Sequence, residues 1–238
     1  MTAQACEDLL FIWTDPANRR RNVVGCLQKW PARYTFRYAK SLPSTAGTKF
    51  WAFPAFPDIT RVYESQELFP AFARRLPDSS RTDFGKFLSA FGLKPPVSSW
   101  DLLKVSGGRL ATDTFEFAIP LQRNDDQIAF DFYVAGWQYH GAHVDPQEYA
   151  ESARLNIAPE VSNPHDPHAF SVMTTQGHKL GYVPAFYAET LARLHASVEG
   201  RVVTFNPEAG PRGALFVRLT GKLPPSAHAE TLVDCFCK

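Results

Sequence analysis

The sequence predicts an α+β protein of two domains. The N-terminal one is a strand-then-helix α+β domain, and the C-terminal one is a β-rich, partly open barrel-like domain with one main helix. Apolar residues alternate with a period of two before residue 40 and again beyond residue 128, whereas residues 65–105 between them follow the helical period. A polar segment without apolar periodicity, residues 121–127, separates the two blocks and is predicted to be a linker.

The N-terminal block, residues 1–120, begins with strand patterns and continues with helical ones. Strands are predicted over Leu9–Trp13, Val23–Trp30, Arg33–Tyr38, Phe50–Phe56 and Arg109–Ile119. The fourth of these contains Pro54 and precedes Pro57, and it is therefore expected to be an edge or bent strand. Apolar residues on one face predict helices over Ser65–Leu76, Thr82–Phe91 and Ser99–Val105. Ser65 is a suitable N-cap for the first helix.

The C-terminal block, residues 128–222, consists mainly of predicted strands, and residues 223–238 form a tail. The strand candidates are Ile128–Tyr139, Arg154–Ala158, Ala169–Thr174, Lys179–Val183, Val202–Asn206 and Leu215–Gly221. One strong amphipathic pattern predicts a helix over Pro184–Val198, and Asp145–Ala153 is a shorter candidate. Such a strand-rich domain with one helix favours a small curved sheet or a partly open barrel.

The charge distribution limits the kind of nucleic-acid binding that is expected. The formal net charge is +1, with a surplus of four positive charges in residues 1–127 and a net charge of −2 in residues 128–222. A non-specific duplex binder usually has a strong positive surplus, because counterion release supplies its affinity. Any nucleic acid is therefore expected at a small site and not along a broad basic face.

The compartment is predicted to be the cytoplasm. No apolar stretch is long enough to span a bilayer, and no signal peptide opens the chain, so no membrane partner is expected. The four cysteines lie near the two ends of the chain and make no dense framework: Cys6, Cys26, Cys235 and Cys237. Free thiols in a reducing compartment are the favoured interpretation.

Motifs for catalysis are missing, so the protein is predicted not to be an enzyme and to need no cofactor. No phosphate-binding loop, dinucleotide fingerprint or G-x-S-x-G elbow occurs. Two histidine pairs, His140 with His143 and His165 with His168, have spacings that suit a metal. Exposed loop histidines are the favoured interpretation, because nothing forces the rings toward one point. A metal-dependent nuclease is a third-ranked hypothesis.

A compact turn, Asn163-Pro-His-Asp-Pro167, is the most unusual local element. Pro164 fixes the backbone, and Asn163 and Asp166 have side chains that accept hydrogen bonds from nearby backbone amides. The turn is therefore expected to be rigid. A rigid turn also presents Asp166 as a fixed hydrogen-bond acceptor.

The C-terminal block resembles the HIRAN domain. Three motifs occur in the right order: Val134-Ala-Gly-Trp-Gln-Tyr-His140, Pro159-Glu-Val-Ser-Asn-Pro-His-Asp-Pro-His-Ala169 and Gly177-His-Lys-Leu-Gly-Tyr-Val-Pro184. HIRAN domains are small β-rich modules, and the form linked to Swi/Snf-type helicases captures the 3′-hydroxyl end of single-stranded DNA. The resemblance implies a DNA-binding site formed by Gln138, Tyr139, Asn163, His165, Asp166 and Tyr182, with no catalytic and no metal-binding residue.

The resemblance also implies individual roles. Tyr139 and His165 would face bases, Asp166 would accept a hydrogen bond from the terminal hydroxyl, and Tyr182 would lie beside a phosphate. Gln138 stands where the DNA-binding form has an arginine that holds a phosphate, and Tyr182 replaces a histidine with a similar role. These two departures, with the negative charge of the block, predict weak phosphate binding.

The N-terminal block is similar to the N-terminal subdomain of HipA-type toxin kinases. The similarity lies in Val24–Leu27, Tyr34–Tyr38, Leu68–Pro77 and Trp100–Gly108. It implies a surface that engages a protein partner, such as a HipA-like kinase. The leading hypothesis is therefore a non-enzymatic two-domain adaptor that binds single-stranded DNA ends and a protein. The alternative is a regulatory antitoxin-like subunit that restrains a HipA-family kinase and binds no nucleic acid.

Overall fold

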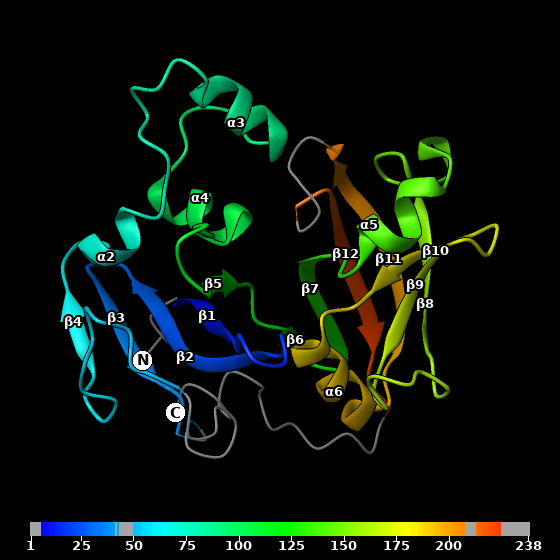
Figure 1. Ribbon diagram of the computed structural model, residues 1–238, viewed down its shortest axis with the longest axis horizontal. Helices are drawn as coiled ribbons and strands as arrows, with labels where there is room; N and C mark the ends of the chain where they lie inside the picture. The colour runs from blue at the N-terminus through cyan, green and yellow to red at the C-terminus, as the bar shows by residue number, and fades with distance from the viewer. Residues whose placement is uncertain (1–5, 41, 43–49, 208–212, 225–238) are drawn as a thin grey trace. The chain divides into compact units, whose positions relative to one another are not determined.

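The computed structural model describes residues 6–40, 42, 50–207 and 213–224 and is rich in strands, with two antiparallel sheets (Figure 1). The chain divides into two compact units. The first contains the described residues up to Ser89 together with Leu93–Pro120. The second contains Ala90–Gly92 and the described residues from Leu121 onward.

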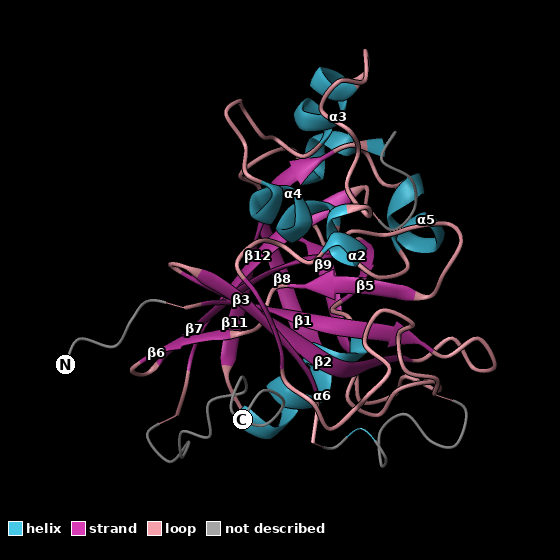
Figure 2. Cartoon of the chain, turned by 90° about the vertical axis from the view of Figure 1, so that its left-hand side faces the viewer, coloured by secondary structure: helices cyan, strands magenta, loops and turns pink. Residues whose placement is uncertain are grey.

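The N-terminal unit is built on a five-stranded sheet with the order β4-β3-β2-β1-β5. Its strands are β1 Glu7–Thr14, β2 Arg21–Trp30, β3 Arg33–Tyr38, β4 Tyr63–Ser65 and β5 Phe115–Ala118. Three helices follow in this part of the chain: α2 Pro70–Ala73, α3 Phe84–Ala90 and α4 Ser99–Ser106. Figure 2 shows α2 and α4 on one side of this sheet. The predicted strand Arg33–Tyr38 matches β3, and the predicted helix Ser99–Val105 matches α4 to within one residue.

An aromatic cluster fills the core between this sheet and its helices. The Phe11 ring lies 5.3 Å from Phe36 and 5.6 Å from Phe72, measured between ring centroids. All three side chains are fully buried. Aromatic contacts of this kind add to the stabilisation that burial of the same area provides. Most of the phenylalanine surplus in the first half of the sequence thus serves packing.

Three predictions for the N-terminal block are wrong in their extent. Ser65 ends strand β4 and does not cap a helix, because the helix begins only at Pro70, whose missing N–H and fixed φ suit a first helical position. Residues 50–56 form a loop, in which the Phe53 amide donates to the Tyr38 hydroxyl at 2.8 Å. Strand β5 is only four residues long, because the residues before it wrap around the buried Arg75 side chain.

The C-terminal unit has a seven-stranded antiparallel sheet with the order β10-β9-β8-β11-β12-β7-β6. Its strands are β6 Gln122–Asn124, β7 Gln127–Tyr133, β8 Arg154–Pro159, β9 Phe170–Thr174, β10 Lys179–Tyr182, β11 Ser197–Phe205 and β12 Leu215–Lys222. A single bridge joins Ala135, just after β7, to Tyr182 at the end of β10. The sheet therefore curls strongly without closing into a barrel.

Buried and exposed residues alternate along the strands of this second sheet. Ile128, Phe130 and Phe132 of β7 are buried, whereas the residues between them are at least partly exposed. Helix α6, Ala185–Leu194, covers the buried face, with the Tyr187 ring 4.4 Å from the Phe130 ring. Figure 1 shows α6 near the lower end of this sheet. The buried face is thus the inner face, and the opposite face is called the outer face below.

Several C-terminal elements differ from their predicted extents. Strand β7 stops at Tyr133 because Gly136 adopts φ +73 and begins the short helix α5, Trp137–His140. Helix α6 ends at Leu194, where His195 takes a left-handed conformation, and β11 starts two residues later. Two 3₁₀ turns, η2 Gly141–His143 and η3 Pro146–Tyr149, replace the predicted helix near Asp145. The predicted linker contains β6, which pairs with β7.

The cysteines follow the predictions only in part. Cys6 is a free thiol, whereas Cys26 is disulfide-bonded, so the expectation of free thiols is wrong at Cys26. Cys235 and Cys237 lie outside the described residues, as does most of the predicted tail. Burial and the carboxylate of Asp8 raise the pKa of the Cys6 thiol to about 12, which makes it a poor nucleophile.

In the parts of the chain that the structure covers, no helix is long and apolar enough to cross a membrane.

Candidate functional site

Three segments meet at one edge of the C-terminal sheet: helix α5, the turn of residues 160–169 and the end of β10. The link between α5 and β10 is a reciprocal pair of backbone hydrogen bonds. Ala135 donates its amide to the Tyr182 carbonyl at 2.8 Å, and the Tyr182 amide donates to the Ala135 carbonyl at 2.9 Å. The His140 ring lies 5.4 Å from the Tyr182 ring in an edge-on arrangement. Helix α5 is therefore fixed against the strand.

Two glycines allow this close approach. A Cβ atom on Gly181 would lie 2.4 Å from the Ala135 carbonyl oxygen, and its φ is +145. A Cβ atom on Gly141 would lie 2.3 Å from Cδ1 of Trp137. No side chain larger than hydrogen fits at such distances. Gly181, the glycine of the Gly-Tyr-Val-Pro motif, is therefore required by the close packing of β10 against the segment that leads into α5.

The turn of residues 160–169 is held by its own side chains. Oδ1 of Asn163 accepts hydrogen bonds from the His165 amide at 3.0 Å and the Asp166 amide at 3.1 Å. Oδ1 of Asp166 accepts from the His168 amide at 2.9 Å. These local bonds agree with the rigid turn expected from the sequence. Oδ2 of Asp166 accepts no hydrogen bond from any residue that the structure describes.

A polar network that the sequence did not predict connects the turn to β10. Nζ of Lys179 lies 2.6 Å from Oε1 of Glu160 and donates to the Tyr182 hydroxyl at 3.2 Å. The other Glu160 oxygen accepts from Nδ2 of Asn163 at 3.2 Å. The ammonium group of Lys179 also lies 5.0 Å from the centre of the Tyr182 ring, within range of a cation–π interaction. Two of the predicted site residues, Asn163 and Tyr182, are therefore joined through Glu160 and Lys179.

The electrostatics of this network favour an ionised Glu160. Hydrogen bonds from Lys179, Tyr182 and Asn163 lower the pKa of its carboxyl to about 2. Lys179 in turn has a raised pKa, chiefly because it donates to Glu160. The two charges neutralise each other, so Lys179 brings little net positive charge to the site. The weak phosphate binding expected from the sequence stays a prediction.

We expect Glu160 to titrate near pH 2 in the folded protein, well below the value of about 4.3 for a free glutamate. Because the folded pKa is lowered, the stability that the pair contributes is complete above the unfolded value. That contribution is lost as the pH falls toward 2. NMR titration of the Glu160 side chain checks this value. In Lys179→Met the pKa should rise toward that of a free glutamate; an unchanged pKa in this variant would show that Lys179 is not the cause.

The surface around the network carries exposed rings and apolar groups. The Tyr139 side chain on α5 is 72% exposed, and Val161 in the turn is 86% exposed. Gln138 and His165 are exposed as well, whereas Asn163, Asp166 and Tyr182 are half-buried. An exposed tyrosine on a fixed helix is suited to stack on a flat ring such as a base. Glu160, Lys179 and Val161 are the members of this surface that sequence analysis missed.

No metal centre accompanies this surface within the described part of the chain. No group of three or more His, Cys, Asp or Glu residues there has a geometry that would hold a metal ion. His178 lies outside the two predicted pairs, and its Nδ1 is 2.8 Å from Oε2 of Glu148. That carboxylate also accepts from the Thr174 hydroxyl at 2.8 Å. The Glu148 contacts thus connect η3 to the β9–β10 hairpin.

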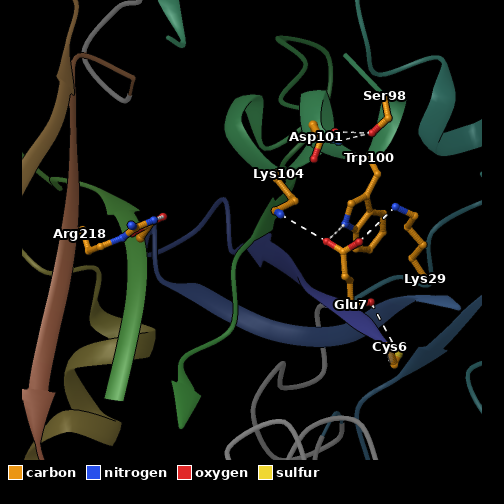
Figure 3. A network of polar contacts seen from close by, with 9 residues as sticks. Cys6, Glu7, Lys29, Ser98, Trp100, Asp101, Lys104 and Arg218 are labelled. Atoms are coloured by element: carbon orange, nitrogen blue, oxygen red, sulfur yellow. Dashed lines mark hydrogen bonds and ion pairs between the residues drawn. The ribbon is translucent and has the colours of Figure 1, made fainter. Parts of the chain in front are cut away.

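A second polar cluster lies in the N-terminal unit and is shown in Figure 3. The carboxylate of Glu7 on β1 accepts hydrogen bonds from Nε1 of Trp100 at 2.9 Å, Nζ of Lys29 at 3.1 Å and Nζ of Lys104 at 3.3 Å. Trp100 and Lys104 belong to α4, and Ser98 caps the start of this helix, because its hydroxyl accepts a hydrogen bond from the Asp101 amide at 3.1 Å. These contacts attach α4 to the sheet. The cluster is a structural contact and not a candidate site.

The C-terminal unit is thus a small curved antiparallel domain with one main helix and a polar and aromatic surface at one edge. Its residues 128–219 match the family model of the HIRAN domain. The resemblance inferred for the C-terminal block is therefore confirmed, and the match covers less than half of the whole chain.

Three solved structures, two of them of the HLTF HIRAN domain, match this chain at low sequence identity. The crystal structure of the HIRAN domain of human HLTF is 20% identical, with 42% of this chain and 78% of that chain covered and a TM-score of 0.34. A protein from Lactobacillus plantarum is 23% identical, with 41% and 99% covered and a TM-score of 0.33. The NMR structure of the HLTF domain is 19% identical, with 41% and 80% covered and a TM-score of 0.28.

Nothing among curated proteins matches the chain. The family model and the solved structures give no support to the resemblance between the N-terminal block and HipA-type kinases. The fold of that block is described by its own sheet and helices alone.

Proposed function

We propose that the C-terminal unit binds the 3′ end of single-stranded DNA on the surface formed by α5, the turn of residues 160–169 and the end of β10. The match to the HIRAN domain supports DNA as the ligand class. The observation that carries the proposal is the exposed Tyr139 ring on a helix that is hydrogen-bonded and packed against the β10 end of the site. In this proposal Tyr139 stacks on a base, and His165 flanks the same strand from the turn.

The terminal hydroxyl is recognised by Asp166. One oxygen of this carboxylate is used to hold the turn, and the other accepts no hydrogen bond from the described residues. A fixed carboxylate oxygen is a strong acceptor for a hydroxyl donor. Asn163 positions Asp166 by accepting from its backbone amide at 3.1 Å. The site therefore selects an end by a hydrogen bond and not by charge.

Phosphate binding at this end site is weak. Gln138 is exposed but carries no charge, and Lys179 is paired with Glu160 at 2.6 Å. Stacking is then the main source of affinity, at about 1–3 kcal/mol per base. A site of this kind is expected to prefer short single strands and to depend little on salt.

The whole chain acts, in this proposal, as a non-enzymatic adaptor whose N-terminal unit engages a protein partner. Exposed apolar side chains in the N-terminal unit support a partner there: Trp51 is 84% exposed, Val62 50% and Ile59 44%. An exposed apolar side chain of this size is more favourable when a partner covers it. DNA recovered intact after incubation with the protein is the expected outcome, and cleavage would contradict a purely binding role.

Fluorescence anisotropy with a short labelled single strand tests the end site. We expect Tyr139→Ala to weaken binding about tenfold or more, because the stacking platform is lost. Tyr139→Phe keeps the ring and is the matched control, so it should bind nearly as the natural protein does. Equal affinities for the alanine and phenylalanine variants would contradict the proposed role of the ring.

A further inference from the structure

We propose a second DNA-contacting surface on the outer face of the C-terminal sheet, where Arg154, Arg201 and Arg218 form a row that binds the phosphodiester backbone of single-stranded DNA. The proposal rests on the proposed function, since it assumes that this unit binds such a strand. It adds the phosphate contacts that the end site lacks. The row is named the arginine row below.

The register of the sheet creates the arginine row. Arg218 of β12 pairs directly with Arg201 of β11, and Arg201 pairs with Arg154 of β8. Directly paired residues have Cα atoms about 5 Å apart, so three guanidinium groups are placed side by side across three neighbouring strands. All three residues are exposed, whereas Leu155 and Leu219 beside them in sequence are buried. The arginines therefore extend from the outer face.

The charges on this face are only partly compensated. Arg218 donates to both oxygens of Asp131, with each bond 2.7 Å long, and Figure 3 shows the Arg218 side chain extending from β12. Among the described residues, the Arg201 side chain donates only to the Ser152 carbonyl, at 2.9 Å. The Arg154 side chain makes no hydrogen bond or ion pair with the residues that the structure describes. Glu199, the nearest outer-face carboxylate on β11, lies one row away, opposite Asn156.

Like charges placed directly opposite each other destabilise a sheet. Two such pairs, Arg218 with Arg201 and Arg201 with Arg154, occur here with one carboxylate to share. An external anion would relieve this repulsion. The planar guanidinium group matches phosphate oxygens in a bidentate arrangement, which makes arginine well suited to a phosphodiester.

A groove beside the arginine row suits the rest of a nucleotide. Its volume is about 850 Å³, and polar side chains of β6, β7, β11 and β12 line it: Gln122, Asn124, Gln127, Ser197, Glu199, Thr220 and Lys222. Glu199 and Lys222 bring one negative and one positive charge to this lining. Thr220 lies two residues from Arg218 on the same face of β12, so the groove adjoins the row. Amide and hydroxyl groups donate and accept hydrogen bonds, as the edges of bases do. A single strand with its backbone on the row would therefore place bases over this groove.

The test compares Arg154→Ala with Arg193→Ala in the full chain. Arg193 lies on α6, which packs Tyr187 against the inner face, so this control removes the same charge from the other side of the sheet. Anisotropy is measured with a short strand of about 4 nucleotides and a long strand of about 20, between 50 and 500 mM salt. The short strand reports the end site, and the long one reports both surfaces.

We expect Arg154→Ala to weaken binding of the long strand by about tenfold at 50 mM salt and to reduce the salt slope by about 0.7, the value for one phosphate contact on a single strand. Arg193→Ala should leave both quantities unchanged. Arg154→Lys should restore most of the slope. Thermal unfolding is recorded for each variant, and an equal melting temperature shows that the loss is not one of folding.

Each outcome decides between the two proposals. A long-strand affinity and salt slope that are the same in Arg154→Ala and Arg193→Ala would overturn the arginine row and leave the end site intact. A normal Arg154 effect without any preference for a free 3′ end would overturn the end site alone. Binding of polyglutamate with no binding of the long DNA strand would show that the row serves an acidic protein and would overturn the proposal.

Discussion

Arg75→Ala is expected to lower the free energy of unfolding of the N-terminal unit by about 3–5 kcal/mol, the range found when one partner of a buried ion pair is removed. The Arg75 side chain is 1% exposed. Its guanidinium donates to both oxygens of Asp113, at 2.6 and 2.8 Å, and to the carbonyls of Gly108 and Phe115, each at 2.6 Å. Truncation removes the donor from all of these acceptors, and because they are largely buried, water cannot fully replace it.

Denaturant unfolding of this variant should show a lower midpoint for the N-terminal unit. Arg74→Ala is the matched control, because the neighbouring residue is exposed and its removal deletes the same charge. A stability loss for Arg75→Ala no larger than that for Arg74→Ala would contradict the role assigned to the buried guanidinium. It would also remove the explanation given above for the short strand β5.

Gly181→Ala is expected to lower the free energy of unfolding of the C-terminal unit by about 3 kcal/mol or more. The added Cβ would lie 2.4 Å from the Ala135 carbonyl oxygen and 2.7 Å from Cγ1 of Val134, and the residue has φ +145. Either the backbone bridge between Ala135 and Tyr182 breaks or the strand shifts, and both also disturb the end site. We therefore expect a lower melting temperature together with weaker DNA binding.

Gly177→Ala separates the two causes of this loss. Gly177 has φ +91, but no atom lies within 4 Å of the Cβ that an alanine would place there. Alanine at this position has the unfavourable φ but no collision, so Gly177→Ala should lower the free energy of unfolding by only about 1 kcal/mol. Thermal unfolding of the two variants measures the difference; equal melting temperatures would contradict the claim that close packing of β10 fixes the site.

Much of the strand framework could be predicted from the sequence. Strand β3 occupies the predicted residues Arg33–Tyr38, because the alternation of Tyr34, Phe36 and Tyr38 with polar residues is a strong local signal. The predicted helix start at Ser65 is wrong because Pro70 cannot lie inside a helix: it has no backbone N–H to donate, and its ring would collide with the preceding turn. The strand predicted through Tyr139 was wrong because a single glycine at a positive φ redirects the backbone into α5.

The candidate site was only partly predictable. The rigid turn at Asn163 follows from local chemistry, because its hydrogen bonds link residues two and three positions apart. The pair of Glu160 with Lys179 joins residues 19 positions apart and requires the hairpin register, which no local pattern gives. The arginine row requires two strand registers at once, β12 with β11 and β11 with β8, so its members appear in the sequence as unrelated surface residues.

The central claim is that the C-terminal unit captures a free 3′ end of single-stranded DNA. Anisotropy with one short strand, bearing either a 3′-hydroxyl or a 3′-phosphate, measures this most directly. We predict affinity about tenfold higher for the hydroxyl end, a preference that Asp166→Asn abolishes, since the amide keeps the bond to the His168 amide but loses the charged acceptor. Equal affinity for both ends in the natural protein, or no binding of either, would contradict the account.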